Sequence, residues 1–367
     1  MEHKMTNARA DAERLRDELK AWALDHAFPL WWEVGADHVK GGFFEKIAQD
    51  GTPVEAPRRA RVQPRQIYSY AVAGLLGWTG PWKQALNHGL DFYLAKYRRP
   101  DGFMRTLVAS DGAPLDDKVD LYDQAFGLFG LAMAAQVLPE RTDLPVLAAQ
   151  LRDRLHAELK HPVAGFEESV PRSLPLLSNP HMHLFEASLA WLEVSGEARW
   201  RSMADEIAEL ALSKFIDPVS GGLREYYDGD WNPAPGVTGR IIEPGHQFEW
   251  AWLLLRWGKL AGRDDAQAVK MLVDGLKAKG RDLTQRHVSA IGDGVERQPL
   301  THTGLASVEV WRFTAGASAT LPPSTIQVLD GALTGEAALA AGDRRDLTVQ
   351  TGVTATHAAT VLVTTWR

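Results

Sequence analysis

Two histidine–glutamate pairs are the strongest chemical signal in the chain. His246 precedes Glu249 by three residues, and His183 precedes Glu186 by the same interval. Residues three apart share one face of a helix, and each pair opens a strongly apolar helical segment. Because imidazole exchanges protons near neutral pH, the two histidines are candidate acid–base groups at the mouths of buried helices.

The two pairs belong to an internal repeat. Arg65 and the dipeptide Tyr122–Asp123 open similar apolar segments, so that positions 65, 123, 183 and 246 are 58, 60 and 63 residues apart. A near-constant period of about sixty residues indicates a repeated supersecondary unit. We therefore expect these four positions at equivalent places, with the two histidines matching each other.

Each unit also contains a short segment bounded by glycine. Residues 41–45, 101–105, 165–168 and 221–225 each lie between an amphipathic helical pattern and an apolar one. Such segments predict small hairpins. We expect the apolar helices to form an inner layer and the amphipathic helices an outer layer, with the inner N-termini at one rim, where their unpaired N–H groups suit oxygen-rich ligands.

The pattern changes towards the C-terminus. A first helix is expected over residues 7–32 and a last outer-type helix over 266–279, after which five short β-branched segments carry Gly and Pro punctuation. These segments predict a small sheet or barrel. We place the boundary near residue 300, which gives a helical domain over 1–300 and a small β-rich domain over 301–367.

The ordered motifs resemble the N-acylglucosamine 2-epimerase family, which includes mannose isomerases, related ketose–aldose isomerases and cellobiose 2-epimerases. The resemblance covers roughly residues 10–290 and rests on residues 63–66, 122–126, 179–187 and 239–249. It implies a mainly α fold, an (α/α)6-type barrel with a central sugar pocket. It also implies acid–base roles for His246 and His183, no metal and no cofactor. The implied sugar-binding residues are Arg65, Tyr122, Asn179, Arg240 and Glu249.

The chain departs from the family pattern in its last third. Only four of the six repeats are visible, and His287, His302 and His357 do not match the context of the family's third histidine. The sequence therefore leaves open whether the barrel closes. The β-patterned tail is similar to the cupin-type C-terminal piece of phosphomannose isomerases.

Proton transfer on an opened sugar needs a base, an acid and a donor for the enediolate oxygen. The histidines supply the first two, and Arg65 and Arg240 the third. We expect Arg240 and the helix dipole to favour neutral imidazole at His246, against the charge of Glu249.

Two other uses of these residues remain open. The His–Glu faces, with His181, could hold a metal, and three further arginines could bind phosphate, namely Arg58, Arg59 and Arg61.

Composition narrows the class of partner. The net charge of −7 gives no reason to expect nucleic acid or an anionic membrane, and the absence of cysteine fits a reducing compartment. Residues 1–20 lack the apolar core of a signal peptide, so we expect a cytoplasmic protein.

The function expected is a metal-independent sugar isomerase of the mannose/fructose type. A 2-epimerase and a non-catalytic carbohydrate-binding protein are the alternatives, and a homodimer is left open.

Overall fold

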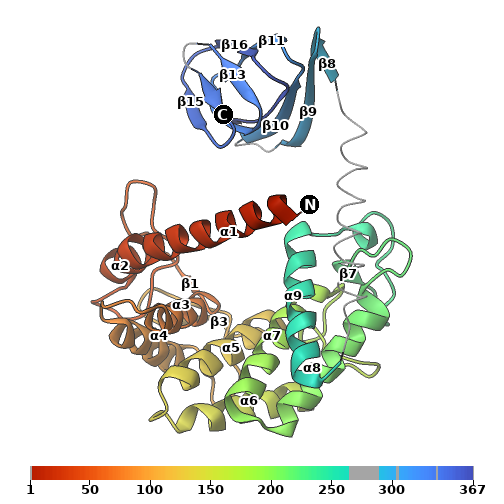
Figure 1. The fold of residues 1–367 in the computed structure, drawn as a ribbon. Helices are drawn as coiled ribbons and strands as arrows, with labels where there is room; N and C mark the ends of the chain where they lie inside the picture. Colours follow the sequence, from red (N-terminus) through yellow and green to blue (C-terminus); the bar gives the residue numbers. More distant parts are fainter. Residues whose placement is uncertain (1, 264–288, 303–305, 336–337, 367) are drawn as a thin grey trace. The chain divides into compact units, whose positions relative to one another are not determined.

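The computed structural model describes residues 2–263, 289–302, 306–335 and 338–366. The chain forms two compact units, Met1–Gly275 and Leu276–Arg367, and each is described by itself (Figure 1). The helix expected over residues 266–279 lies outside the described residues. Among the described helices, none is long and apolar enough to cross a membrane.

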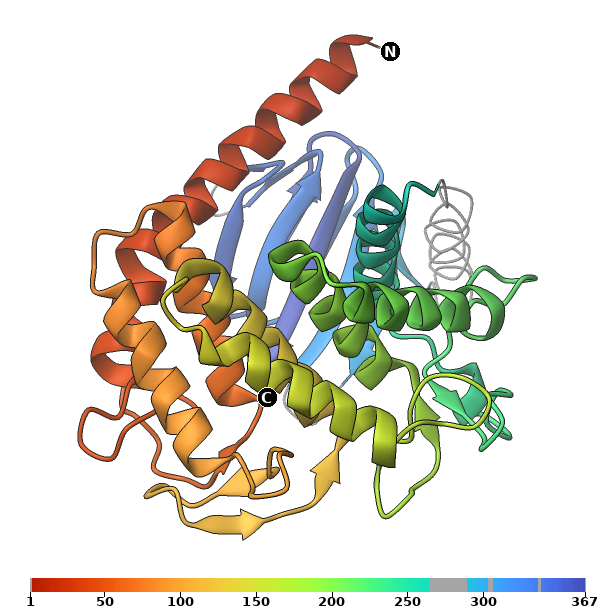
Figure 2. The ribbon, with the colours of Figure 1, turned by 90° about the horizontal axis from the view of Figure 1, so that it is seen from below.

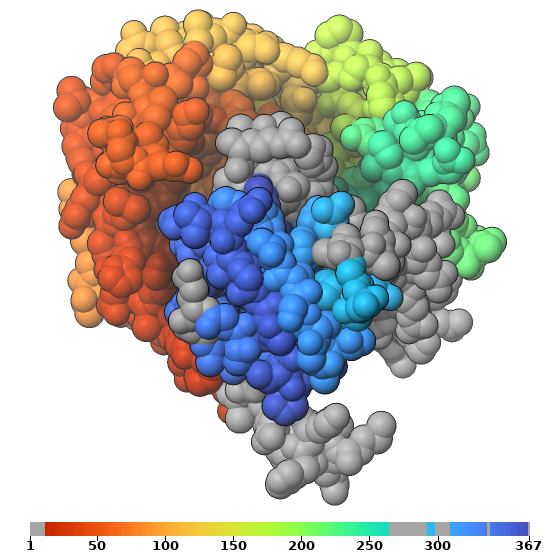
Figure 3. Space-filling view, turned by 90° about the horizontal axis from the view of Figure 1, so that it is seen from above, coloured from red at the N-terminus to blue at the C-terminus, as the bar shows by residue number. Residues whose placement is uncertain are grey.

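The helical unit consists of inner helices that run side by side and outer helices that cover them. The inner helices pack in the order α3, α5, α7, α9, and the outer helices α4, α6 and α8 pack on the inner helix that precedes each of them. Figures 2 and 3 show these segments following one another in an arc, from orange through yellow to green and teal. The inner helices are α3 (Val62–Leu76), α5 (Leu121–Val137), α7 (Ser178–Ser195) and α9 (Pro244–Ala261). The outer helices are α4 (Trp82–Lys96), α6 (Asp143–Glu158) and α8 (Ala198–Leu210), which continues as η3 (Ala211–Phe215).

The first helix is longer than its sequence pattern indicated. Helix α1 spans Glu2–Trp22, and helical backbone continues without a break to Gly35. The continuation consists of η1 (Ala23–Ala27), α2 (Phe28–Leu30) and η2 (Trp31–Gly35). Pro29 lies inside this continuous stretch, in the short α2 segment between the two π-helical turns η1 and η2.

Helix ends follow local chemistry. The carboxylate of Asp120 accepts a hydrogen bond from the Tyr122 N–H and so caps the start of α5. Helices α7 and α9 end at Gly196 and Gly262, which adopt φ values of 70° and 66°. A left-handed residue at this place ends a helix, and glycine adopts that conformation without strain.

Short strands tie each repeat to the next. The strand before an inner helix pairs with the loop of the following repeat, so that β1 pairs with β2, β4 with β5 and β6 with β7. These pairings hold the N-termini of successive inner helices at one rim. The strands are β1 (Arg58–Arg59), β2 (Leu107–Val108), β3 (Pro114–Asp116), β4 (Val119–Asp120), β5 (Ser169–Val170), β6 (Leu176–Leu177) and β7 (Tyr226–Tyr227). Before α9 the chain forms a single 3-10 turn, η4 (Thr238–Arg240).

A side-chain clasp sets the register of the repeats. The Gln63 amide accepts from the N–H of Phe43 and donates to its carbonyl, both at 2.9 Å. Gln124 binds Met104, and Gln247 binds Leu223, in the same two-bond pattern. In the third repeat His181 takes this place, because its Nε2 accepts from the Phe166 N–H at 3.0 Å. We call these contacts the backbone clasp; each joins a hairpin to the inner helix that follows it.

The clasp corrects the expected alignment. Equivalent positions are 63, 124, 181 and 247, so His183 matches Glu249, two residues after the clasp. His246 instead matches Asp123, one residue before the clasp. The expectation that the two histidines occupy matching places was therefore wrong, because the loops between hairpin and helix differ in length.

The second unit contains two antiparallel sheets around one apolar core. A six-stranded sheet has the order β15-β12-β17-β10-β9-β8, and a four-stranded sheet has the order β11-β16-β13-β14. Apolar side chains of both sheets, including Trp311, Val361, Leu333 and Val353, share one buried cluster. The strands are β8 (Ser289–Gly292), β9 (Val295–His302), β10 (Ala306–Phe313), β11 (Ser318–Leu321), β12 (Ser324–Asp330), β13 (Ala332–Thr334), β14 (Leu339–Ala340), β15 (Arg344–Leu347), β16 (Thr351–Ala355) and β17 (Ala359–Trp366).

The β-rich unit starts earlier than its strand pattern indicated. The boundary expected near residue 300 falls inside β9, which pairs with β10 along most of its length. Five or more strands were anticipated from β-branched alternation. Strand β9 was missed because Glu296, Arg297, Gln298 and Pro299 interrupt any apolar alternation. Likeness of this unit to a cupin stays a prediction.

Candidate functional site

Four residues of equivalent position form a continuous row across the inner helices. They are Arg65, Phe126, His183 and Glu249, each two residues after a clasp. The Arg65 guanidinium lies 4.3 Å from the centre of the Phe126 ring, and that ring lies 4.4 Å from the imidazole of His183. The His183 Nδ1 is 3.8 Å from Oε1 of Glu249. The repeat thus places a cation, an aromatic ring, an imidazole and a carboxylate next to one another.

Tyr122 joins this row from the first turn of α5. Its hydroxyl accepts a hydrogen bond from Nη2 of Arg65 at 2.8 Å, and its ring meets the His183 imidazole edge to face at 5.0 Å. The neighbouring Asp123 is fully buried and pairs with Arg61 at 3.0 Å. Burial raises the pKa of Asp123 to about 6, against the charge of Arg61. We conclude that the Asp123–Arg61 ion pair stabilises the rim, whereas the side chains of Tyr122 and Arg65 contact the other residues of the row.

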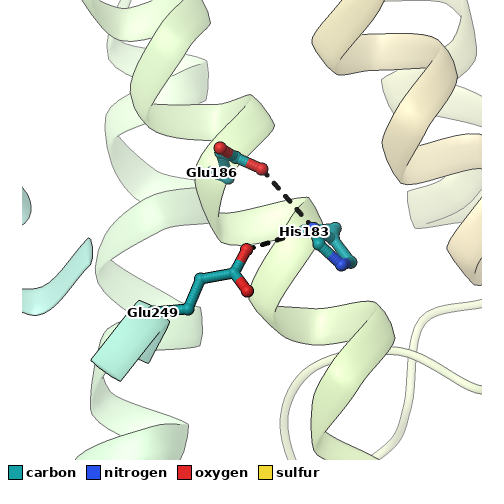
Figure 4. Close-up of side chains that lie close together, drawn as sticks. All are labelled: His183, Glu186 and Glu249. Carbon is teal, nitrogen blue, oxygen red and sulfur yellow. Dashed lines mark hydrogen bonds and ion pairs between the residues drawn. The ribbon is translucent and has the colours of Figure 1, made fainter. Parts of the chain in front are cut away.

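His183 lies between two carboxylates (Figure 4). Its Nδ1 is 3.4 Å from Oε2 of Glu186, one turn along α7, and 3.8 Å from Oε1 of Glu249 on α9. Burial raises the pKa of Glu249, and the charge of His183 opposes that shift. One ligand atom from each of the three residues lies within 4.8 Å of the others, so these are the described residues that could hold a metal ion. Glu249 thus joins the His183–Glu186 pair in this cluster, while His181 and His246 of the expected metal site are not part of it.

His246 stands at the first turn of α9 and has a different partner. Its Nδ1 lies 3.0 Å from Oε2 of Glu225, whose side chain is almost fully buried. This hydrogen bond raises the pKa of His246, and burial acts in the opposite direction. The expectation that Arg240 and the helix dipole make the imidazole more acidic was therefore wrong: Glu225 is the dominant neighbour, and the charges of Glu249 and Glu243 add to its effect.

Asn179 and Arg240 lie differently from each other. Asn179 is half-buried in the first turn of α7, and its Oδ1 is buried with no hydrogen-bond partner among the described residues. Arg240 is exposed at the end of η4, and no contact of its side chain with the row around His183 is seen in the described part of the chain. The structure brings together Arg65, Tyr122, His183 and Glu249, but it does not bring Arg240 to them.

Sequence reasoning missed two members of this region. Phe126 reads as an ordinary core residue of an apolar helix, and Glu225 reads as the polar end of a hairpin. A signal for Glu225 was present, because the hairpin segments 41–45, 165–168 and 221–225 all end in glutamate. Its partner is 21 residues away in sequence, so the pairing could not be read from spacing alone.

Comparison with known proteins identifies the family to which the chain is related. The profile of the family described as N-acylglucosamine 2-epimerase (GlcNAc 2-epimerase) matches residues 42–298. The chain belongs to the N-acylglucosamine 2-epimerase family. It is 52% identical over 255 residues to a protein of Rhizobium meliloti (strain 1021) named mannose-6-phosphate isomerase, and the match covers 69% of this chain and 65% of that protein. The chain thus spans less than two thirds of this relative.

Two solved structures of similar fold have sequences more distant from this one. Cellobiose 2-epimerase from Spirochaeta thermophila DSM 6192 superposes with a TM-score of 0.67 at 23% identity, over 76% of this chain and 72% of that one. A D-mannose isomerase superposes with a TM-score of 0.64 at 22% identity, over 71% and 70%. The expected α/α-barrel architecture with a β-rich C-terminal region is thereby confirmed, and four inner helices of the barrel lie in the described residues.

Proposed function

We propose that the chain is a sugar isomerase that interconverts an aldose and a ketose of the mannose/fructose type by histidine acid–base catalysis. One observation carries the proposal: an imidazole hydrogen-bonded to a buried carboxylate, His246 with Glu225, stands at the same rim as the row that contains Arg65 and His183. The names of the Rhizobium relative and of the D-mannose isomerase structure agree with this reading.

The residues divide the work as follows. His246 takes the proton from C2 of the open-chain aldose, and the electrons of that bond form the C1–C2 double bond of an enediolate. Arg65 stabilises the negative charge that develops on oxygen, since a guanidinium beside a low-dielectric aromatic surface interacts strongly with an oxyanion. His183, held between two carboxylates, moves the proton of the second step or opens the sugar ring.

Substrate contacts come from the remaining polar groups. Asn179 offers a buried amide oxygen that has no hydrogen-bond partner among the described residues, and Glu249 offers a half-buried carboxylate. Both accept hydrogen bonds, which suits sugar hydroxyls as donors. We also propose that no metal takes part, because Arg65 already supplies the positive charge that the enediolate needs.

An exchange experiment in D2O tests the reaction and names the substrate. Purified protein is incubated with mannose, fructose and mannose 6-phosphate, and the recovered sugars are examined for deuterium. Isomerisation of mannose gives fructose labelled at C1, and isomerisation of fructose gives mannose labelled at C2. Deuterium at C2 of a 2-epimer, with no ketose, would mean that the chain is an epimerase. Binding without any exchange would mean that it is not an enzyme of this kind.

A further inference from the structure

We propose that Glu225 is a positioning residue that fixes the tautomer and the orientation of His246. The inference rests on the proposed function, since it concerns the group that takes the C2 proton. Glu225 itself is not assigned a contact with the sugar.

The carboxylate of Glu225 is anchored on both sides. Its backbone N–H donates to the carbonyl of Ile241, and its backbone carbonyl accepts from the Ser178 N–H, both at 3.1 Å. Its Oε2 accepts from the Ser178 hydroxyl at 3.2 Å and from His246 Nδ1 at 3.0 Å. Because Ser178 opens α7 and Ile241 leads into α9, the carboxylate is fixed relative to both inner helices.

An ionised carboxylate can only accept hydrogen bonds, which decides the state of the imidazole. His246 must carry its proton on Nδ1, and the lone pair of Nε2 is then free to receive a proton from a substrate. The same arrangement stabilises the imidazolium that forms when Nε2 is protonated. Glu225 thus supplies both the correct tautomer and the charge that makes the base stronger.

The second carboxylate oxygen argues against a purely structural role. Oε1 of Glu225 is buried and has no hydrogen-bond partner among the described residues. Buried polar atoms that serve only the fold are nearly always paired. A glutamine or an apolar residue at position 225 would avoid the free-energy cost of burying a charge. The carboxylate therefore needs a reason other than the fold, and its hydrogen bond to His246 provides that reason.

Comparison of the repeats shows what is special about this position. The residue two places after each clasped hairpin residue is Glu45, Thr106, Glu168 or Glu225. In the first three repeats this residue binds the chain that leads into the next inner helix. The partners there are the Arg59 side chain, the Lys118 carbonyl and the Leu177 N–H. Only in the fourth described repeat does this position bind a histidine side chain.

The test uses two substitutions at Glu225 and one matched control. Glu225→Gln keeps an acceptor of the same shape without the charge, and Glu225→Ala removes both. Glu168→Gln changes a buried carboxylate at the equivalent position of the preceding repeat, where it faces no histidine. Circular dichroism establishes that each variant is folded.

Two readouts separate positioning from structure. The first is the imidazole NMR spectrum of His246 in the full chain, which reports its tautomer and its pKa without substrate. The second is the pH profile of C2 proton exchange with the sugar that the wild type labels. We expect Glu225→Gln to lower the pKa of His246, to move the acid limb of the profile to lower pH and to slow exchange roughly tenfold to a hundredfold, with KM within about twofold. Glu225→Ala should also lose the Nδ1–H tautomer. Glu168→Gln should leave both readouts unchanged.

The outcomes distinguish this inference from the proposed function. If the pKa and tautomer of His246 stay unchanged in both Glu225 variants, the positioning role is overturned. It is also overturned if they change while exchange proceeds at the wild-type rate. A wild-type protein that exchanges no sugar proton overturns the proposed function and the catalytic purpose of Glu225 together, and the spectra then still show whether Glu225 sets the tautomer.

Discussion

His246 holds a proton more tightly than free imidazole does, because Glu225 accepts a hydrogen bond from its Nδ1. A general base works only while it is neutral, and its strength increases with its pKa. The wild-type rate of C2 exchange should therefore rise with pH through a value above 6.5, the usual pKa of histidine. The exchange rate should thus increase with pH, and the position of that increase is set by the hydrogen bond between His246 and Glu225.

Replacement of the base is the first prediction at the scale of single residues. His246→Asn should keep the fold and sugar binding but lose about a hundredfold or more in exchange rate, the scale of a general base. His183→Asn should lose a comparable or smaller factor. The measurement is C2 proton exchange into D2O, which reports the abstraction step even when no product forms. Exchange at the wild-type rate in His246→Asn would show that another group takes the proton.

Glu249 should act on binding as well as on rate. Its carboxylate lies 3.8 Å from Nδ1 of His183, and its charge also interacts with that of His246. We therefore expect Glu249 to influence both histidines. Glu249→Gln should raise KM and lower the exchange rate together. Glu140→Gln, which changes an exposed carboxylate in the loop between α5 and α6, is the control. A change in neither parameter would remove Glu249 from the site.

The three metal-competent residues lead to a prediction about cations. Activity should survive exhaustive chelation, because the proposed chemistry takes its positive charge from Arg65. Added Zn²⁺ should inhibit, since His183, Glu186 and Glu249 present ligand atoms within 4.8 Å of one another where the sugar would bind. Metal analysis accompanies the assay. Activity that disappears on chelation and returns with one added cation would assign the site to a metal instead.

At the scale of elements, apolar segments predicted the inner helices well, but their exact register could not be predicted. In the sequence, the clasp residues Gln63, Gln124 and Gln247 cannot be distinguished from ordinary polar residues. The third repeat has a histidine, His181, at this position, so the glutamines do not recur in every repeat. Their role depends on backbone groups 15 to 24 residues earlier. His183 and Arg65 could be selected as candidates from residue type, whereas the pairing of Glu225 with His246 required the fold.

The clasp itself supports a prediction about stability. Gln247→Ala removes both hydrogen bonds to Leu223 and leaves its N–H and carbonyl unpaired next to the core. Each buried unpaired group costs about 1–3 kcal/mol, so the loss of two should lower the unfolding free energy of the helical unit by about 2–6 kcal/mol. Urea unfolding followed by the helical circular dichroism signal measures it. Gln66→Ala, on α3 and outside the clasp, should change it little. Equal losses in both variants would contradict the role of the clasp.

At the scale of the molecule, one buried carboxyl should make stability depend on pH. Burial raises the pKa of Glu168 from 4.5 to about 8. The folded chain therefore keeps a proton that the unfolded chain loses, so this contribution is complete below pH 4.5 and declines as the pH rises towards 8. Glu168→Gln can keep the bond from the Leu177 N–H and should reduce the decline, while the raised pKa values of Asp123, Glu249 and His246 leave part of it in place. Thermal unfolding at pH 5 and pH 8 compares the variant with wild type. Glu140→Gln, fully solvated, is the control, and an unchanged pH dependence in Glu168→Gln would refute the assignment.

The strand pairings between successive repeats also bear on how such a chain can change. Since β4 joins β5 and β6 joins β7, each repeat is bonded chiefly to its two neighbours, as in a linear array. Nucleation in one repeat can spread to the next through contacts that are close in sequence, which favours rapid folding. Evolution can then shorten or extend the array at an end while disturbing a single junction, and a row of side chains built from adjacent repeats would survive the loss of distant ones.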